Sequence, residues 1–306
     1  MSMFGSFNRS KCRVRTLSTV QKSTLVLAYL KTNPNSSLRS VAEILGLSYS
    51  TVQCICKRYK YHPYKSTNVQ QLLTSDYERR LEFVFHIMVN LEDNPNFLSR
   101  ILWTDESKFC NNGVVNHHNS HYWSDTNPHL TIESKSQFRW NINVWCGVID
   151  NKLIGPYFFE ENLNATRYLN FLKNDLPVLL EDLPLEMRQH IIWQQDGAPA
   201  HNAKIVQQYL NTIYYNGNWI GTNSPVVKWP PRSPDLTVLD FYLWSYLKNE
   251  VYREQQQFSS KEELKLKITE VCSNIPHDVI KRATNNEVKR RLEFCFNTDG
   301  QHFQHL

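Results

Sequence analysis

The chain has 306 residues, of which 41% are hydrophobic, so it is long enough for at least two domains with their own cores and too apolar for a disordered chain. It carries 34 Lys and Arg residues against 29 Asp and Glu residues, a net charge of +5. The first 65 residues hold 11 of the basic residues and a single acid, Glu43. This asymmetry predicts a basic amino-terminal module that binds a polyanion, with nucleic acid as the favoured partner, and a mildly acidic body behind it.

The cysteine and apolar patterns exclude several classes of protein. The seven cysteines are scattered and lack zinc-finger spacing, which favours free thiols in a reducing compartment. No apolar run approaches the roughly 18 residues that span a bilayer, and the first ten residues lack the apolar stretch of a secretion signal. We therefore expect neither a secreted nor a membrane protein.

The apolar spacing within residues 1–62 predicts three short helices, over 16–30, 38–45 and 48–59. Ser37 and Ser48 can cap the second and third helices, and Gly46 allows the tight turn between them. This pattern is typical of a helix-turn-helix domain, although a plain corner between two helices would share it. A polar and basic third helix, preceded by a basic arm, favours DNA binding. The predicted DNA-binding residues are Arg13, Arg15, Ser48, Tyr49, Ser50, Thr51, Gln53, Lys57 and Arg58.

A helix over 69–89 is expected within a helical linker, residues 63–96. Beyond it, strands and helices alternate in a way that predicts an α/β domain over 97–306. The expected strands are 101–103, 138–148, 152–159, 191–193 and 226–229, with an extended segment over 114–123. The expected helices are 165–180, 203–213, 235–251, 260–273 and 276–296.

Three acids in this body form a candidate metal site. Asp105 and Asp196 follow apolar strands, and Asp240 lies in the helix expected after the last strand. Taken singly, each is more often a cap or a turn residue. Together they suit a pair of divalent cations, which prefer carboxylate oxygens and can promote attack on a phosphodiester.

Asp235 competes with Asp240 for the third position. It stands where the helix over 235–251 is expected to begin, so its side chain can cap the first turn. Five helical positions rotate a side chain by roughly 140° net, so the two acids cannot both face one metal pair. We choose Asp240. His201 has two interpretations, contact with substrate phosphate or a structural role at a helix start, and Glu106 is interpreted as a neighbour of the site.

Three sequence blocks resemble the catalytic blocks of mariner-type transposases: WTDES at 103–107, QDGAPAH at 195–201 and WPPRSPDLTVLD at 229–240. The resemblance extends over nearly the whole chain. It implies an RNase H-like catalytic domain of the DDE class, a mixed sheet flanked by helices, preceded by the all-α helix-turn-helix domain. It also implies that Asp105, Asp196 and Asp240 are catalytic residues and ligands of two Mg²⁺ or Mn²⁺ ions.

The same resemblance implies cut-and-paste transposition. The implied substrate is double-stranded DNA, both terminal inverted repeats and target DNA, handled in the nucleus by a homodimer without a small-molecule cofactor or a membrane. The sequence departs from the family in a longer stretch between Asp196 and Asp240, with 216–225 as the extra loop. The helix-turn-helix resembles the family's second unit, and we expect the first to be lacking, with residues 11–15 in place of the usual arm.

Two alternatives remain open at this point. The chain could be a relic or domesticated sequence-specific DNA-binding protein with little or no transposition activity. It could also be an RNase H-like nuclease acting on RNA, which the helix-turn-helix disfavours. Metal-dependent nicking of plasmid DNA would separate the first alternative from an enzyme.

Overall fold

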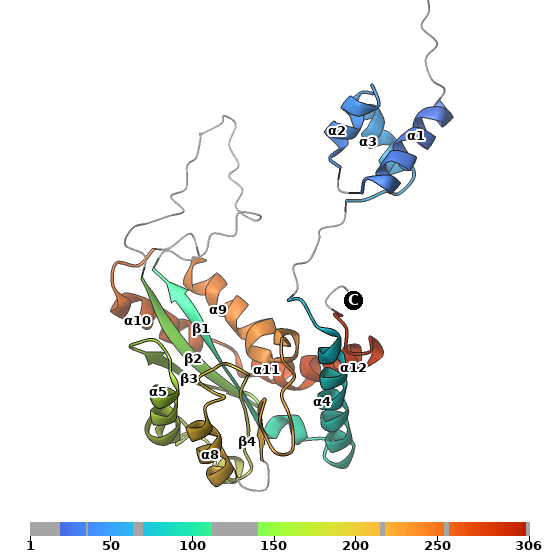
Figure 1. Ribbon diagram of the computed structural model, residues 1–306. Coiled ribbons are helices and arrows are strands. Elements are labelled where there is room, and N and C mark those ends of the chain that lie inside the picture. The colour runs from blue at the N-terminus through green and yellow to red at the C-terminus, as the bar shows by residue number, and fades with distance from the viewer. Residues whose placement is uncertain are drawn as a thin grey trace, which may run out of the picture. The chain divides into compact units, whose positions relative to one another are not determined.

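The computed structural model describes residues 19–34, 36–63, 70–111, 140–214, 218–253 and 257–303 of the chain (Figure 1). The extended segment expected over 114–123, the arm residues Arg13 and Arg15 and part of the loop 216–225 lie outside these residues. The chain divides into two compact units, Met1–Thr67 and Asn68–Leu306, and each is described by itself. Of the described helices, none is long and apolar enough to cross a membrane.

The smaller unit contains three helices: α1 (Thr19–Thr32), α2 (Leu38–Ile44) and α3 (Tyr49–Arg58). The hydroxyl groups of Ser37 and Ser48 accept backbone N–H groups in the first turns of α2 and α3, as their positions in the sequence predict. Gly46 has φ of +61° in the turn between them, a conformation that a side chain would strain. The shared core consists of Val26, Leu30, Val41, Ala42, Val52, Ile55 and Cys56.

Five strands of the larger unit form one mixed sheet in the order β3-β2-β1-β4-β5. They are β1 (Ile101–Cys110), β2 (Asn141–Ile149), β3 (Lys152–Phe159), β4 (Ile192–Gln194) and β5 (Trp219–Ile220). The first three pair antiparallel as a meander, and β4 and β5 run parallel to β1. The expected α/β fold, a mixed sheet flanked by helices, is confirmed.

Two strands differ from the sequence prediction. The stretch 226–229 is not a strand: only Val227 forms a bridge, to Ile220, and β5 lies earlier in the chain. Pro230 and Pro231 follow at once and have no backbone N–H to extend a ladder. In addition, β1 continues to Cys110, well beyond Trp103, because its later residues pair with β2 although several are polar.

Helices cover both faces of the sheet (Figure 1). One face carries α5 (Ala165–Asn170), η2 (Phe171–Asp175), α6 (Leu176–Leu179), α7 (Leu185–Gln189) and α8 (Lys204–Ile213). The other carries α4 (Thr74–Asp93), η1 (Phe97–Arg100), η4 (Pro234–Leu236), η5 (Leu239–Leu243), α9 (Trp244–Val251), α10 (Lys261–Ser273), α11 (His277–Lys281), η7 (Arg282–Glu287) and α12 (Val288–Asn297).

Side chains along β1 alternate between the two resulting cores, as in any pleated strand. Trp103 and Phe109 pack in the core beneath α4 and α9, whereas Leu102 packs in the core beneath α5 and α8. Asp105 therefore shares the face of Trp103, and Glu106 lies on the opposite face of the sheet.

The single helix expected over 235–251 is interrupted. Thr237 has an extended backbone, with φ −105° and ψ 134°, and separates η4 from the helical run that begins at Leu239. Asp235 therefore lies in a separate short turn, and the expectation that it caps the helix is wrong. The side chain of Asp235 is engaged in the tertiary contact described next, which a local helix pattern does not reveal.

Asp235 instead forms a buried ion pair with Arg80 of α4. The guanidinium donates to both carboxylate oxygens, over 2.8 and 2.6 Å, and both side chains are almost fully buried. Arg80 also donates to the hydroxyl of Ser233 and to the carbonyl oxygen of Gly300, each over 2.8 Å. One buried cation thus joins α4, the turn before Asp240 and the turn that follows α12.

The helix expected in the linker is present as α4, but it belongs to the larger unit. Phe83, Val84 and Ile87 are buried in that unit's core, and Arg80 makes the contacts described above. The division of the chain falls at residue 67, and residues 70–96 are part of the larger unit, not a separate linker. The sequence did not indicate this, because α4 contains many charged residues and nothing in their order shows that Arg80 is buried.

We expect the Arg80→Met substitution to lower the free energy of unfolding by about 3–5 kcal/mol, because it leaves the carboxylate of Asp235 buried and unpaired. The double substitution Arg80→Met and Asp235→Leu removes both charges and should cost less. Urea denaturation measures both. Arg79→Met, an exposed position on the same helix, is the control. Equal stability of the Arg79 and Arg80 variants would contradict the prediction.

Candidate active site

Asp105 lies in the middle of β1, opposite Cys146 of β2, on the sheet face covered by α9. Its Oδ2 atom accepts a hydrogen bond of 2.7 Å from Trp244 Nε1, which fixes the carboxylate against the first turn of α9. Burial raises the pKa of Asp105 well above its usual range, and the negative charges of Asp240 and Glu106 raise it further. A cation bound beside this carboxylate would offset the repulsion from the neighbouring negative charges and stabilise its ionised form.

Asp240 lies in η5, at the start of the helical run that follows Thr237. Its side chain is exposed, yet nearby protein atoms shield it partly from bulk water. This desolvation, followed by the charge of Asp196, raises its pKa to about 6, while Lys248 acts in the opposite direction. The pKa values of Asp105 and Asp240 are therefore both raised by burial and by neighbouring carboxylates, and a bound cation would stabilise the ionised form of each.

Asp196 stands two residues beyond the end of β4, in the turn that leads to α8. Its Oδ1 atom accepts two hydrogen bonds, from the backbone N–H of Ala198 over 2.9 Å and from His201 Nδ1 over 2.6 Å. Burial acts to raise the pKa of Asp196, but the hydrogen bond and charge of His201 outweigh it and lower the pKa. Asp196 is thus the one acid of the three that is held ionised by a cation already in the protein.

The three carboxylates line one cavity of about 300 Å³. Its wall is completed by Gln70, Thr104, Gln194, Gly197, Ala198, Trp229, Pro231, Arg232, Ser233, Pro234 and Thr237. Gly197 allows a close approach there, because a Cβ atom at this position would stand 2.8 Å from the hydroxyl oxygen of Thr222. Asp235 does not line the cavity, since its carboxylate faces Arg80.

This donor set fits hard divalent cations. Among the described residues, no three His, Cys, Asp or Glu side chains stand close enough to enclose a metal ion by themselves. Mg²⁺ needs no such cage, because it is held by one or two carboxylates together with waters and substrate phosphates. An open cavity lined by three acids, two of them with raised pKa, meets that requirement.

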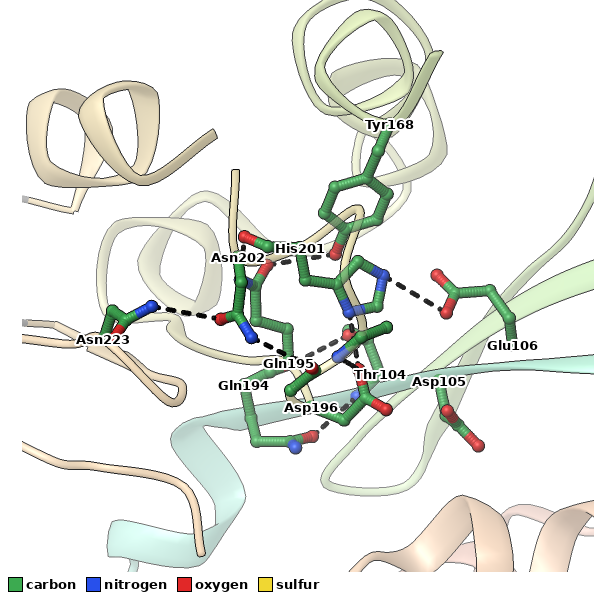
Figure 2. A network of polar contacts seen from close by, with 12 residues as sticks. Thr104, Asp105, Glu106, Tyr168, Gln194, Gln195, Asp196, His201, Asn202 and Asn223 are labelled. Carbon is green, nitrogen blue, oxygen red and sulfur yellow. Dashed lines mark hydrogen bonds and ion pairs between the residues drawn. The ribbon is translucent and has the colours of Figure 1, made fainter. Parts of the chain in front are cut away.

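Behind Asp196, a polar network occupies the other face of the sheet (Figure 2). His201 is almost fully buried between two carboxylates, with Nδ1 2.6 Å from Asp196 and Nε2 3.3 Å from Glu106. Its ring lies over the ring of Tyr168, with centroids 4.1 Å apart. Burial would lower the pKa of His201, but Glu106 and Asp196 raise it to about 10. The imidazole is therefore cationic at neutral pH, and its burial argues against contact with substrate phosphate.

The predicted DNA-binding residues of the smaller unit lie at the start and on the surface of α3. Thr51 is half-buried and the others are exposed: Ser48, Tyr49, Ser50, Gln53, Lys57 and Arg58. The buried residues of α3, Val52, Ile55 and Cys56, occupy its opposite side. The unit therefore presents a polar and basic helix face to solvent.

Sequence reasoning missed several residues that shape the site. Trp244 carries no signal, because a buried aromatic residue in a helix is ordinary core material. His201 and Glu106 were noted singly, and Glu106 was expected to point away from Asp105, but nothing in the sequence paired the two residues.

The fold and the acids together define a class, an RNase H-like α/β domain that presents carboxylates from the central strand, from the end of its parallel neighbour and from a helix. The chain belongs to the DDE superfamily endonuclease family, whose model matches residues 100–265, more than half of the sequence.

Two curated relatives and one solved structure illustrate the likeness. The human histone-lysine N-methyltransferase SETMAR is 23% identical over 294 residues, 90% of this chain and 39% of that protein. The mariner Mos1 transposase of Drosophila mauritiana is 28% identical over 146 residues, 47% of this chain and 39% of that protein. The expected resemblance to mariner-type transposases is confirmed, and this chain matches about two fifths of the length of each relative.

The solved structure is the mariner Mos1 paired end complex with Mg, which is 22% identical, with a TM-score of 0.74. The match covers 98% of this chain and 85% of that one. At this level of identity the likeness shows the fold.

The raised pKa of Asp240 predicts a stability that depends on pH and metal. The folded chain holds this proton more tightly than the unfolded chain, so the contribution of Asp240 to the free energy of unfolding falls as pH rises from about 4 to about 6. Mn²⁺ or Mg²⁺ bound to the native state should raise the melting temperature most above pH 6. Thermal melts with and without metal test this, and Asp240→Asn should reduce both effects. A metal-independent melting temperature at pH 7 would count against a metal site.

Proposed function

We propose that this chain is a DNA transposase of the mariner type, which cleaves transposon ends and transfers the strands to target DNA by a cut-and-paste mechanism. The observation that carries the proposal is the convergence of Asp105, Asp196 and Asp240, from three separate elements, on one cavity. The chain's membership of the DDE superfamily endonuclease family supports it.

The three acids would hold two divalent cations, Mg²⁺ or Mn²⁺. Such a pair, when bound, supplies Lewis acidity that activates the attacking group and stabilises the leaving oxygen of a phosphodiester. The protein supplies the positions: Trp244 orients the carboxylate of Asp105, and Arg80 fixes the turn that precedes Asp240. The similar solved structure contains Mg, which supports this choice of cation.

The smaller unit is proposed to be a helix-turn-helix domain whose α3 enters the major groove of double-stranded DNA. Its exposed polar and basic residues suit phosphate and base-edge contacts, and Arg13 and Arg15 are proposed to extend these contacts as an arm. We further propose a homodimer that pairs two terminal inverted repeats, working in the nucleus. The paired end assembly of the similar mariner structure supports the pairing.

A domesticated DNA-binding protein with little transposition activity is the second candidate. The human relative motivates it, because a protein named as a methyltransferase carries, within 39% of its length, a region that matches 90% of this chain. The two candidates share the DNA-binding unit and differ in whether the acids cleave.

We expect Asp240→Asn to reduce Mg²⁺-dependent nicking of plasmid DNA by about a thousandfold or more, because a metal ligand contributes several kcal/mol to such a reaction. Asp235→Asn should reduce nicking much less, because it weakens the ion pair that fixes the turn before Asp240 but removes no proposed metal ligand. Asp182→Asn, an exposed acid between α6 and α7, is the matched control and should be fully active. A folded Asp235 variant without activity beside an active Asp240 variant would reverse the assignment, and a folded, DNA-binding but inactive parent chain would favour the second candidate.

The α3 surface predicts a change in the salt dependence of DNA binding. If Lys57 and Arg58 each neutralise one phosphate, replacing both by alanine should reduce the slope of log K against log salt by about 2. Fluorescence anisotropy with duplex DNA at several salt concentrations measures the slope. Lys289→Ala, an exposed lysine of α12, serves as the control. An unchanged slope in the α3 double variant would remove these residues from the interface.

A further inference from the structure

The carboxylate of Asp196 is held by two contacts, and one of them comes from His201, which does not line the cavity. Its Oδ1 atom accepts hydrogen bonds from His201 and from the backbone of Ala198, at 2.6 and 2.9 Å. Within the described part of the chain, Oδ2 accepts no hydrogen bond, while Asp196 lines the cavity together with Asp105 and Asp240. One oxygen is therefore committed to the protein and the other is left for a ligand.

His201 is itself held on three sides. Nε2 stands 3.3 Å from a carboxylate oxygen of Glu106, the ring lies over Tyr168, and the backbone carbonyl accepts a hydrogen bond of 3.2 Å from the side chain of Gln195. The side-chain oxygen of Gln195 in turn accepts from the hydroxyl of Tyr168 over 3.1 Å. The imidazole consequently has little freedom to rotate, and Figure 2 shows it wedged between the two acids.

Glu106 places a carboxylate where burial of its charge costs free energy of folding. It follows Asp105 on β1 and therefore points to the opposite face of the sheet, where its register partner is the buried Trp145. Its Oε1 atom is buried without a hydrogen-bond partner among the described residues. A buried carboxylate oxygen without a partner costs stability, and the charged group that this carboxylate faces is His201.

We infer that His201 and Glu106 are positioning residues for the metal-binding carboxylate of Asp196. Glu106 orients the imidazole, the imidazole fixes Oδ1, and Oδ2 is thereby presented to a divalent cation in the cavity. Ligating carboxylates are commonly oriented by such a second set of contacts, and losing one weakens metal affinity about 10- to 100-fold. The inference rests on the proposed function, because it assumes that Asp196 binds a metal ion.

The test measures Mn²⁺ binding to the full chain, by the loss of the electron paramagnetic resonance signal of free Mn²⁺. His201→Phe keeps an aromatic ring over Tyr168 but removes both nitrogen contacts, and we expect Mn²⁺ to bind about 10- to 100-fold more weakly. His201→Asn keeps an N–H donor near the position of Nδ1 and should recover part of that affinity. His190→Phe, at an exposed histidine after α7, is the matched control and should bind Mn²⁺ like the parent chain.

Glu106→Leu provides an independent variant in case His201→Phe fails to fold. It leaves His201 and Asp196 chemically intact and should still weaken Mn²⁺ binding, because the imidazole loses the contact that orients it. The melting temperature without metal is recorded for each variant. A purely structural role would lower that temperature and leave the Mn²⁺ affinity of the folded protein unchanged, and this result would overturn the inference.

Asp240→Asn separates this inference from the proposed function. If Asp240→Asn loses Mn²⁺ affinity while folded His201→Phe and Glu106→Leu bind as the parent does, the metal site stands and the positioning role is wrong. If Asp240→Asn binds Mn²⁺ as tightly as the parent, or the parent does not bind it, the proposed metal site is wrong and the inference falls with it. Weaker binding in all three variants, with partial recovery in His201→Asn, supports both.

Discussion

The buried ion pair between Arg80 and Asp235 is the contact on which the geometry of the larger unit depends. Both charges are removed from water, so each needs the other, and the guanidinium satisfies further acceptors on Ser233 and Gly300. A helix from the start of the unit, a turn from its middle and its carboxy-terminal end meet at this one cation. Arg232 and Asp76 form a second pair between the same helix and the same turn, with distances of 2.5 and 2.6 Å.

This constraint reaches the candidate site through the backbone. Asp235 is held by Arg80 five residues before Asp240, and only the extended Thr237 separates its turn from the helical run. The ion pair therefore fixes where that run begins relative to α4. Asp105 is fixed by its strand and by Trp244, and Asp196 by the contact with His201. Each acid is thus secured by a different kind of interaction: a buried ion pair upstream, a hydrogen bond from an indole, and a hydrogen bond from an imidazole.

The sequence predicted the parts of this arrangement that depend on local periodicity. The helices of the smaller unit, β3 and the presence of strands before Asp105 and Asp196 follow from apolar spacing and capping residues. The sequence-based predictions were wrong where tertiary contacts determine the local structure. Asp235 looks like a helix cap until Arg80, 155 positions away, is placed against it. The two-residue strand Trp219–Ile220 has no period to detect, and its identity depends on the neighbouring β4.

The alternation of Asp105 and Glu106 has a consequence for how variants and relatives of this chain are compared. Adjacent strand residues face opposite sides, so inserting one codon between Ile101 and Trp103, with the downstream pairing shifted, would exchange the roles of the two acids. Such a gene copy would keep the letters WTDES and every acid, yet direct Asp105 toward the imidazole side and Glu106 toward the cavity. Counting residues from the start of β1 is therefore as diagnostic of an intact site as the presence of the acids themselves.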